Sequence, residues 1–393
     1  MQRRAFLTGA GAITVLVIGG GVWRAYEQGV FSVGKGPAFE PWEDWQATKD
    51  SPLALVRAAI LAASPHNTQP WLFKVTDSSI ALYLDPKRYP GALDPYLREE
   101  HIGMGCALEN LMLAAPANGY AASATLLPAK LRPASEYPSP ELVAQVALSP
   151  GPKQQSELYD AIPHRHTNRN PYLLKDLPAD FVQEVRQLAN DKTDVKVFVF
   201  TTNADRNYIV EMISKANDIV YADPQVVQGS QQWERTEWSD VQKFKDGLIL
   251  DESAAPRLTT AILKFLPPSG RRFGFKHKLL RRMPYRDLLH ATPLFGMIAV
   301  RDRYDREQSL RAGRVWQRAH LLATARRLVG RPVNEVVELI DHQRWLNQEP
   351  QAETDLFGLI GDKTWQPTFM FRFGYPVRQV SPSPRRPVKD VLL

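Results

Sequence analysis

The stretch Ala63-Ser64-Pro65-His66-Asn67-Thr68-Gln69-Pro70-Trp71 connects an apolar helical pattern to a predicted strand. Ser64-Pro65 ends the helix, because a proline disfavours helical backbone at the residue before it. Two interpretations stay open from the residues alone. The favoured one is a capped helix end with a structural tryptophan. In the other, Ser64 and Asn67 lie on a short, proline-fixed connection and hydrogen-bond a planar, polar ligand.

Helices and strands are expected to alternate on both sides of this stretch. Apolar spacing of about 3.6 residues predicts the helices, and short β-branched or aromatic runs predict the strands. In chain order the predicted elements are a helix at 52–63, strands at 71–75 and 80–84, a helix within 94–120, strands at 195–200 and 295–300, and a helix at 312–330 capped by Gly330.

Composition limits the classes of protein to consider. The chain has 393 residues, of which 44% are hydrophobic and 23% charged, and this excludes a disordered chain or a multispanning membrane protein. Its one cysteine, Cys106, excludes an intramolecular disulfide and a cysteine-based metal site. The net charge of +7 favours anionic ligands but falls short of a nucleic-acid binder.

Residues 1–30 are interpreted as a targeting signal or anchor rather than as part of the fold. Arg3-Arg4 precedes Phe6-Leu7 and an apolar run to Trp23, which resembles a twin-arginine export signal. An ordinary secretory signal or a membrane anchor is the alternative, and no clear cleavage site follows the run. We therefore expect the twin-arginine export machinery as a partner, with the protein in the periplasm or anchored in the membrane facing it. Residues 31–45 are expected to form a linker.

Two further stretches are rich in arginine. His164-Arg165-His166-Thr167-Asn168-Arg169 combines two guanidinium groups with a hydroxyl, a set suited to binding phosphate. An exposed basic turn is the alternative, and the two histidines lack the further ligands that a metal site needs. Near the C-terminus, Pro384 and Pro387 bracket Arg385-Arg386 and lower the entropic cost of fixing these arginines on an anion.

Together the three stretches resemble the nitroreductase superfamily of flavin enzymes. The resemblance covers nearly all of residues 45–393 and is most specific at Ser-x-x-Asn-x-Gln-Pro-Trp. It is closest to a branch in which two nitroreductase-like halves are fused, often behind a twin-arginine signal. The resemblance implies an α+β fold of two pseudo-symmetric halves, 46–150 and 151–393, each with a mixed or antiparallel sheet flanked by helices.

The resemblance also implies FMN as the cofactor and assigns roles to single residues. Arg165 and Thr167 would serve the phosphate and ribityl chain, and Arg169 would be the catalytic cation at the flavin N1–C2=O edge. The loop 330–334 would approach flavin N5, but it lacks the usual acidic residue and glycine. The implied cofactor-binding residues are Ser64, Asn67, Gln69, Arg165, His166, Thr167, Arg169, Arg331, Pro332, Arg385 and Arg386.

Because the motifs are divided between the halves, we expect one FMN per chain and a monomer that imitates a dimer. By resemblance, the protein would pass electrons from reduced nicotinamide, or from an envelope partner, to a nitro, quinone or related small-molecule acceptor. The alternative is a non-catalytic FMN-binding protein whose basic segment near 261–290 covers the flavin as a lid. The composition of that segment also fits a solvated insertion or a contact with a membrane surface.

Overall fold

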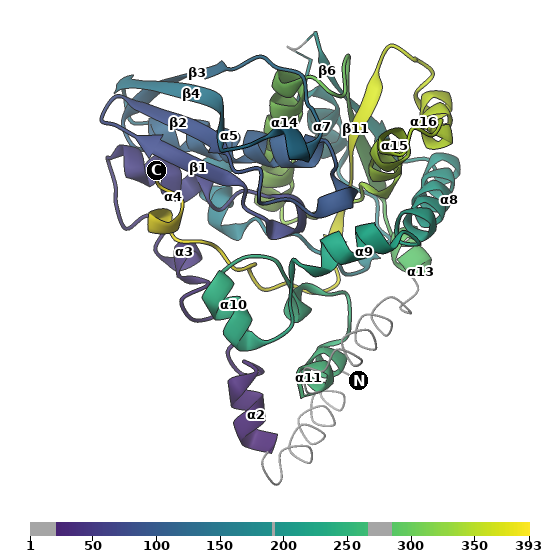
Figure 1. Cartoon of the computed structure of the whole chain (residues 1–393), viewed down its shortest axis with the longest axis horizontal. Helices are drawn as coiled ribbons and strands as arrows, with labels where there is room; N and C mark the ends of the chain where they lie inside the picture. The colour runs from purple at the N-terminus through teal and green to yellow at the C-terminus, as the bar shows by residue number, and fades with distance from the viewer. Residues whose placement is uncertain (1–20, 191–192, 266–284) are drawn as a thin grey trace.

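The computed structural model describes residues 21–190, 193–265 and 285–393 (Figure 1). Arg3-Arg4 and most of the basic segment near 261–290 therefore lie outside the described residues. Within the described ranges, no helix combines the length and the apolar character needed to cross a bilayer. The chain mixes helices and antiparallel sheets, which confirms the α+β class.

The first sheet is built from four antiparallel strands of the N-terminal half, in the order β1-β2-β4-β3. Its predicted hairpin is confirmed, with Val75 opposite Ile80. Alternate residues of β2 are buried, because one face of the sheet packs on the core. The strands are β1 (Trp71–Val75), β2 (Ser79–Leu84), β3 (Tyr120–Leu126) and β4 (Glu141–Pro150).

The second sheet belongs to the C-terminal half and has the order β10-β11-β9-β6, with β5 paired to the end of β11. Every residue of β9 is buried, as expected for a central strand covered on both faces. Helices α7 and α14 lie toward one side of this sheet and α8, α15 and α16 toward the other (Figure 1). The strands are β5 (Tyr172–Leu173), β6 (Val195–Phe200), β9 (Leu294–Val300), β10 (Val329–Pro332) and β11 (Gln366–Pro376).

Shorter elements connect or flank the two sheets. β7 and β8 form a small parallel pair, and α2, α10 and α11 lie apart from the sheets (Figure 1). The helices are α2 (Gly21–Glu27), α3 (Glu40–Glu43), α4 (Pro52–Ala59), α5 (Arg98–Ala117), α6 (Glu157–Ala161), α7 (Ala179–Gln187), α8 (Asn203–Val220), α9 (Pro224–Gln231), α10 (Trp238–Phe244), α11 (Arg257–Phe265), α13 (Tyr285–His290), α14 (Arg306–Ala325), α15 (Glu335–Trp345) and α16 (Gln351–Ile360). The paired strands are β7 (Glu234–Arg235) and β8 (Leu248–Ile249).

Two predicted boundaries were wrong. Helix α4 ends at Ala59, and the late helix covers Arg306–Ala325 rather than 312–330. Gly330 does not cap this helix, because the chain has already reversed at Arg327, which takes a left-handed φ of 60°. Gly330 instead lies in β10, opposite Phe373 of β11. A Cβ there would collide with the Phe373 ring, which explains the glycine.

The stretch expected to be a linker, 31–45, packs on the body of the protein. Phe39 and Trp42 are buried, and α3 begins at Glu40. The indole of Trp42 donates to the Ser383 carbonyl at 2.7 Å, so this stretch supports the C-terminal tail. The tail then crosses to the first sheet, where Leu393 N donates to Phe73 O at 2.9 Å.

Helices α5 and α14 cross at the centre of the molecule (Figure 1). Gly105 and Gly313 meet at the crossing, where a Cβ on Gly313 would lie 2.0 Å from the carbonyl oxygen of Ile102. Glu109 of α5 accepts from Arg314 and Arg318 of α14, at 2.8 Å each. The two glycines therefore allow α5 and α14 to pack backbone against backbone.

We expect Gly313→Ala to destabilise the protein by about 1–3 kcal/mol, because a methyl group at the crossing forces the two backbones apart. Gly358→Ala is the matched control: this helical glycine has no atom within 4 Å of a built Cβ, so alanine there should stabilise by up to about 1 kcal/mol. Urea unfolding of both variants measures the difference. Equal stabilities would contradict the proposed crossing.

Candidate functional site

Segments that are far apart in the chain line two adjoining pockets, an inner part of about 200 Å³ and an outer part of about 710 Å³, which are described together as the cavity. The two parts share His66, Arg169, Glu252, Arg331 and Glu335 in their walls. Most of the predicted cofactor-binding residues converge on the inner part. Those that line it are Ser64, Asn67, Arg165, Thr167, Arg169, Arg331, Pro332 and Arg385.

The turn that follows Ser64 is held in an unusual backbone conformation. His66, Asn67 and Gln69 all have left-handed φ angles, 45°, 55° and 53°, which cost energy for residues other than glycine. The Ser64 hydroxyl accepts from the Gln69 N–H at 3.1 Å and closes the turn. Ser64 does not cap a helix through its side chain, because α4 has already ended at Ala59; the hydroxyl instead closes the turn, and the residue lines the cavity.

Asn67 ties this turn to two other segments. Its side-chain amide donates to the carbonyls of Gly247 at 3.1 Å and Pro384 at 3.0 Å. Its side-chain oxygen accepts from Arg385 at 2.5 Å. Asn67 therefore orients Arg385, although the two residues are more than 300 positions apart.

Gln69 has a structural role and does not line the cavity. Its amide donates to Lys245 O at 2.9 Å, and its oxygen accepts from Arg386 N at 2.8 Å. The Arg386 guanidinium also lies outside the cavity lining, where it donates to Gln69 O at 3.3 Å and to Asp390 O. The tail arginine that lines the cavity is therefore Arg385, and Arg386 fastens the tail.

Arg165 and Arg385 are buried cations with unused donors. Arg165 is 2% exposed and donates to Leu61 O at 3.1 Å, while its Nε and Nη1 have no partner among the described residues. Arg385 is equally buried and donates to Ala62 O at 3.1 Å, with its Nε unpartnered within the same part of the chain. Burial lowers the pKa of Arg165 to about 10 and, with the charge of Arg165 adding to it, that of Arg385 to about 9.

An uncompensated buried charge is costly, so these two arginines favour an anion in the inner cavity. Guanidinium groups match phosphate oxygens in charge and in donor geometry. The Arg385 guanidinium also lies over the ring of Trp42, with its carbon 4.8 Å from the ring centroid. The inner part thus brings together Arg165, from the predicted phosphate-binding motif, and Arg385, from the separate tail stretch, and the binding of phosphate there remains a proposal.

His166 does not line the cavity, unlike its neighbours in the motif. Side chains alternate along extended backbone, so Arg165, Thr167 and Arg169 share one side and His166 takes the other. Its ring packs edge-on against Trp42, with centroids 4.7 Å apart. Burial lowers the pKa of His166 to about 3, which keeps the ring neutral beside the arginines.

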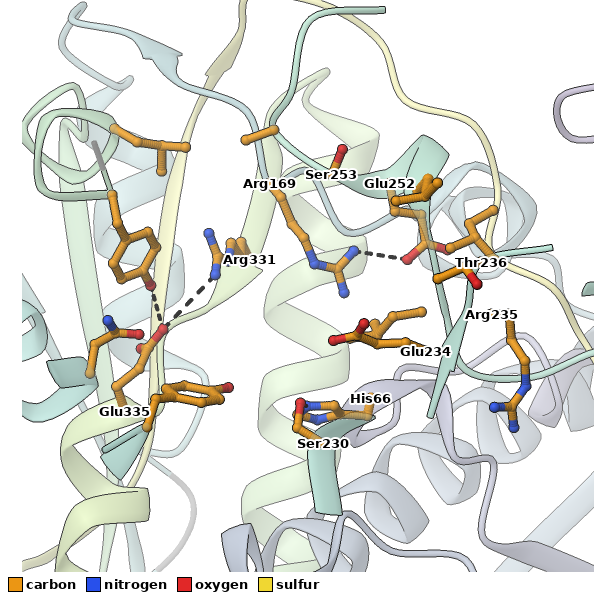
Figure 2. A pocket seen from close by; sticks show the side chains of 18 of the residues that line it. His66, Arg169, Ser230, Glu234, Arg235, Thr236, Glu252, Ser253, Arg331 and Glu335 are labelled. Atoms are coloured by element: carbon orange, nitrogen blue, oxygen red, sulfur yellow. Dashed lines mark hydrogen bonds and ion pairs between the residues drawn. The ribbon is translucent and has the colours of Figure 1, made fainter. Parts of the chain in front are cut away.

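Arg169 lies where the inner and outer parts of the cavity meet. Its guanidinium donates to Glu252 at 2.9 Å, and Figure 2 shows the two side chains facing one another. His66 lies on the opposite wall and shares a 2.9 Å hydrogen bond with Ser230. Burial, aided by the charge of Arg169, lowers the pKa of His66 to about 4, so this ring is neutral at pH 7.

The loop after α14 forms the remaining wall. Thr167 and Gly330 form an isolated parallel β-bridge, and Asn168 N donates to Gly330 O at 3.1 Å. The arginine motif and this loop therefore run side by side. Arg331 lies 3.9 Å from Glu335, which also accepts from the hydroxyl of Tyr285 (Figure 2). This wall thus brings a cation and a carboxylate to the cavity, although the loop lacks the usual acidic residue followed by glycine.

Sequence analysis missed four carboxyl groups in the wall of the inner part: Glu252, which pairs with Arg169, and three glutamates from helices. Glu99 comes from α5, and Glu335 and Glu338 come from α15. Burial raises the pKa of Glu99 to about 8, against the opposing charge of Arg98, and holds that of Glu338 well above its usual range. No local signal in the sequence marks these residues, because α5 and α15 meet only in the folded chain.

Glu99 should make the stability of the protein depend on pH. Its folded-state pKa of about 8 exceeds its usual 4.5, so the folded chain keeps a proton that the unfolded chain releases. This contribution is complete below about pH 4.5 and is lost as the pH rises to about 8. Relative to the parent, Glu99→Gln should therefore gain at least about 1 kcal/mol between pH 5 and pH 8.

Urea unfolding at the two pH values measures this gain, and Glu43→Gln, at an exposed glutamate, is the control. Parallel pH dependence in the parent and Glu99→Gln would show that Glu99 ionises normally in the fold.

No family model matches the chain. It is 29% identical over 152 residues to Rv3131 of Mycobacterium tuberculosis, which is named as a candidate NAD(P)H nitroreductase; this covers 37% of the chain and 40% of that protein. It is 35% identical over 85 residues to a second such protein, acg, covering 22% of the chain and 26% of the relative. The chain thus aligns with less than half the length of these curated relatives.

Solved structures of nitroreductases align with part of this chain. NfnB of Mycobacterium smegmatis, solved with NADPH, has a TM-score of 0.35 at 14% identity, covering 60% of this chain and 96% of that one. A nitroreductase of Desulfitobacterium hafniense with bound FMN has a TM-score of 0.36 at 10% identity, covering 60% and 97%. On the sequence matches, the chain is similar, over part of its length, to proteins of the nitroreductase superfamily.

Proposed function

We propose that this protein is an FMN-binding oxidoreductase of the nitroreductase type. One observation carries the proposal: Arg165 and Arg385 are buried side by side with unused donors at the inner cavity. A phosphate monoester supplies the negative charge and the acceptors that both arginines lack. The mycobacterial relatives and the FMN-bound structures support a flavin nucleotide as the bearer of that phosphate.

The cavity residues fit the rest of an FMN molecule. Arg165 lines only the inner part, whereas Arg169 lies where the inner and outer parts meet, so the two arginines could contact different ends of an elongated ligand. Thr167 lies between them with a hydroxyl for the ribityl chain, and Arg169 offers a cation to the ring. When bound, the flavin would supply hydride chemistry, with Arg169 stabilising negative charge at its pyrimidine edge.

The outer cavity would hold the second substrate. It is walled by His66, Ser230, Arg331 and Glu335, together with Tyr285 from α13 (Figure 2). His66 is neutral at pH 7 because burial lowers its pKa, so it would orient a substrate by hydrogen bonding rather than by charge. We propose a nitro, quinone or related acceptor here, reduced with electrons from a nicotinamide donor or an envelope partner.

We further propose that the chain acts as a monomer that imitates a dimer and holds one FMN. The Ser64 turn comes from the N-terminal half, whereas Arg165, Arg169 and Arg385 come from the C-terminal half. The backbone contact between α5 and α14 supports this arrangement, because it joins the halves as a subunit interface would. Arg3-Arg4 is the basis for proposing twin-arginine export to the periplasm, with or without retention at the membrane.

A non-catalytic FMN-binding protein is the second candidate. Tyr285 and Leu288 of α13 line the outer cavity, so the last part of the basic segment near 261–290 reaches the place where a substrate would enter. A protein that shields its flavin would keep this entrance covered.

We expect Arg165→Ala to weaken FMN binding by about 10- to 100-fold, because it removes charge-assisted bonds to the phosphate. The variant should stay folded, since the lost charge is uncompensated in the parent. Equilibrium dialysis and circular dichroism measure the two quantities, and Arg165→Met preserves side-chain volume if alanine impairs folding. Arg326→Ala, at an exposed arginine that pairs with Glu184, is the control. Unaltered flavin affinity would remove the phosphate assignment.

Rapid mixing distinguishes the two candidate functions. We expect anaerobic addition of NADH or NADPH to bleach the absorbance of bound FMN, and a quinone or nitroaromatic to restore it, because the outer cavity gives access to the ring. Chemical reduction with dithionite controls for flavin that is bound but hidden from the donor. FMN that dithionite reduces, while both nicotinamides and the acceptors have no effect, would favour the non-catalytic candidate.

A further inference from the structure

Glu252 is buried in the cavity wall and has one oxygen unused. The residue is 4% exposed, and its Oε2 accepts from Arg169 Nη1 at 2.9 Å. Its Oε1 is buried without a hydrogen-bond partner among the described residues. A buried carboxylate oxygen without a donor is costly, so this atom favours a ligand that carries an N–H or O–H group.

The main chain fixes Glu252 relative to the rest of the site. Glu252 ends a short 3-10 helix, Leu250–Glu252, which follows β8 directly. The segment before β8 is bonded to the Ser64 turn in both directions: Gly247 N donates to Asn67 O at 3.1 Å, and the Asn67 side chain donates to Gly247 O. The segment that carries Glu252 is therefore hydrogen-bonded to Asn67, the residue that also orients Arg385.

Arg169 and Glu252 together present a donor beside an acceptor. Both residues line both parts of the cavity, and Figure 2 shows their head groups pointing toward one another across it. An imide edge, O=C–N–H, carries the complementary pair of an acceptor beside a donor. The pyrimidine ring of a flavin has such an edge, formed by its C2 carbonyl and N3–H.

We propose that Arg169 and Glu252 bind the pyrimidine edge of the flavin, with Arg169 donating to the C2 carbonyl and Glu252 accepting from N3–H. The inference rests on the proposed FMN site and adds Glu252 to it. Arg165 and Arg385 then bind the phosphate end and the Arg169–Glu252 pair binds the ring end. The carboxylate also places negative charge near the part of the ring that becomes anionic on reduction, which opposes the effect of Arg169.

N3-methyl-FMN tests the contact directly, because it lacks the N3–H donor. The full-length protein should bind FMN at least about 10-fold more tightly than N3-methyl-FMN, measured by quenching of flavin fluorescence. Glu252→Gln keeps a side-chain oxygen and should retain most of this preference. Glu252→Leu has a similar volume but no acceptor, so its preference should fall below about threefold. Asp218→Asn, at another carboxylate of the outer cavity, should behave like the parent.

The reduction potential of bound FMN gives a readout that does not depend on the bulk of the methyl group. Glu252→Gln should raise the midpoint potential, because it removes a negative charge beside the pyrimidine ring, and Asp218→Asn should shift it less. The proposal is overturned if the parent binds both flavins equally or if Glu252→Leu keeps the full preference. An unchanged potential in Glu252→Gln would also overturn it.

The failure of this inference can be told apart from failure of the proposed function. If the parent binds FMN and Arg165→Ala loses it, but N3-methylation has no effect, only the role of Glu252 is wrong. A full-length protein that binds no FMN at any concentration would overturn the proposed function and this inference with it.

Discussion

Two buried guanidinium groups, whose nearby opposite charge is the single carboxylate of Glu252, are the constraint around which the site is organised. Arg165 and Arg385 each donate to a carbonyl of the segment that follows α4. Among the described residues, Nε and Nη1 of Arg165 and Nε of Arg385 have no partner. Stability lost in burying these charges must be regained elsewhere, and the fold does so through extensive apolar packing around the α5–α14 crossing. An arrangement with this cost is maintained where a ligand later supplies the missing charge.

The constraint explains why distant segments are bonded so directly to one another. Asn67 contacts both Gly247 and Arg385, and Gln69 contacts Lys245 and Arg386. These bonds hold three non-glycine residues in left-handed conformations, a local cost that recurs at functional sites. The turn therefore begins after α4 has ended, and it brings Ser64 and Asn67 into the cavity wall.

Local patterns predicted the strands and helices well and the assembly of the site in part. The strands at 71–75 and 195–200 and the helix within 94–120 are confirmed, because apolar spacing records which face is buried. Gly330 was misread as a helix cap because its strand partner, Phe373, is not visible in the local sequence. His166 was included with its neighbours although extended backbone turns it away from them.

The residues that sequence analysis missed share one property. Glu99, Glu252 and Glu338 are distinguished by their burial and by their neighbours from other segments. Their local sequence does not differ from that of a glutamate on the surface. Motifs found the cations because arginines cluster in the sequence. The carboxylates that modulate them are scattered and become recognisable only in three dimensions.

The position of Arg385 has a consequence for biosynthesis. The Ser64 turn and Arg165 leave the ribosome long before the tail that carries Arg385 and pairs with β1 through Leu393. Until then the nascent chain has only one of the two guanidinium groups and lacks the segment that closes the wall. The cavity wall that contains both guanidinium groups can therefore form only after this tail has been synthesised and has packed against β1.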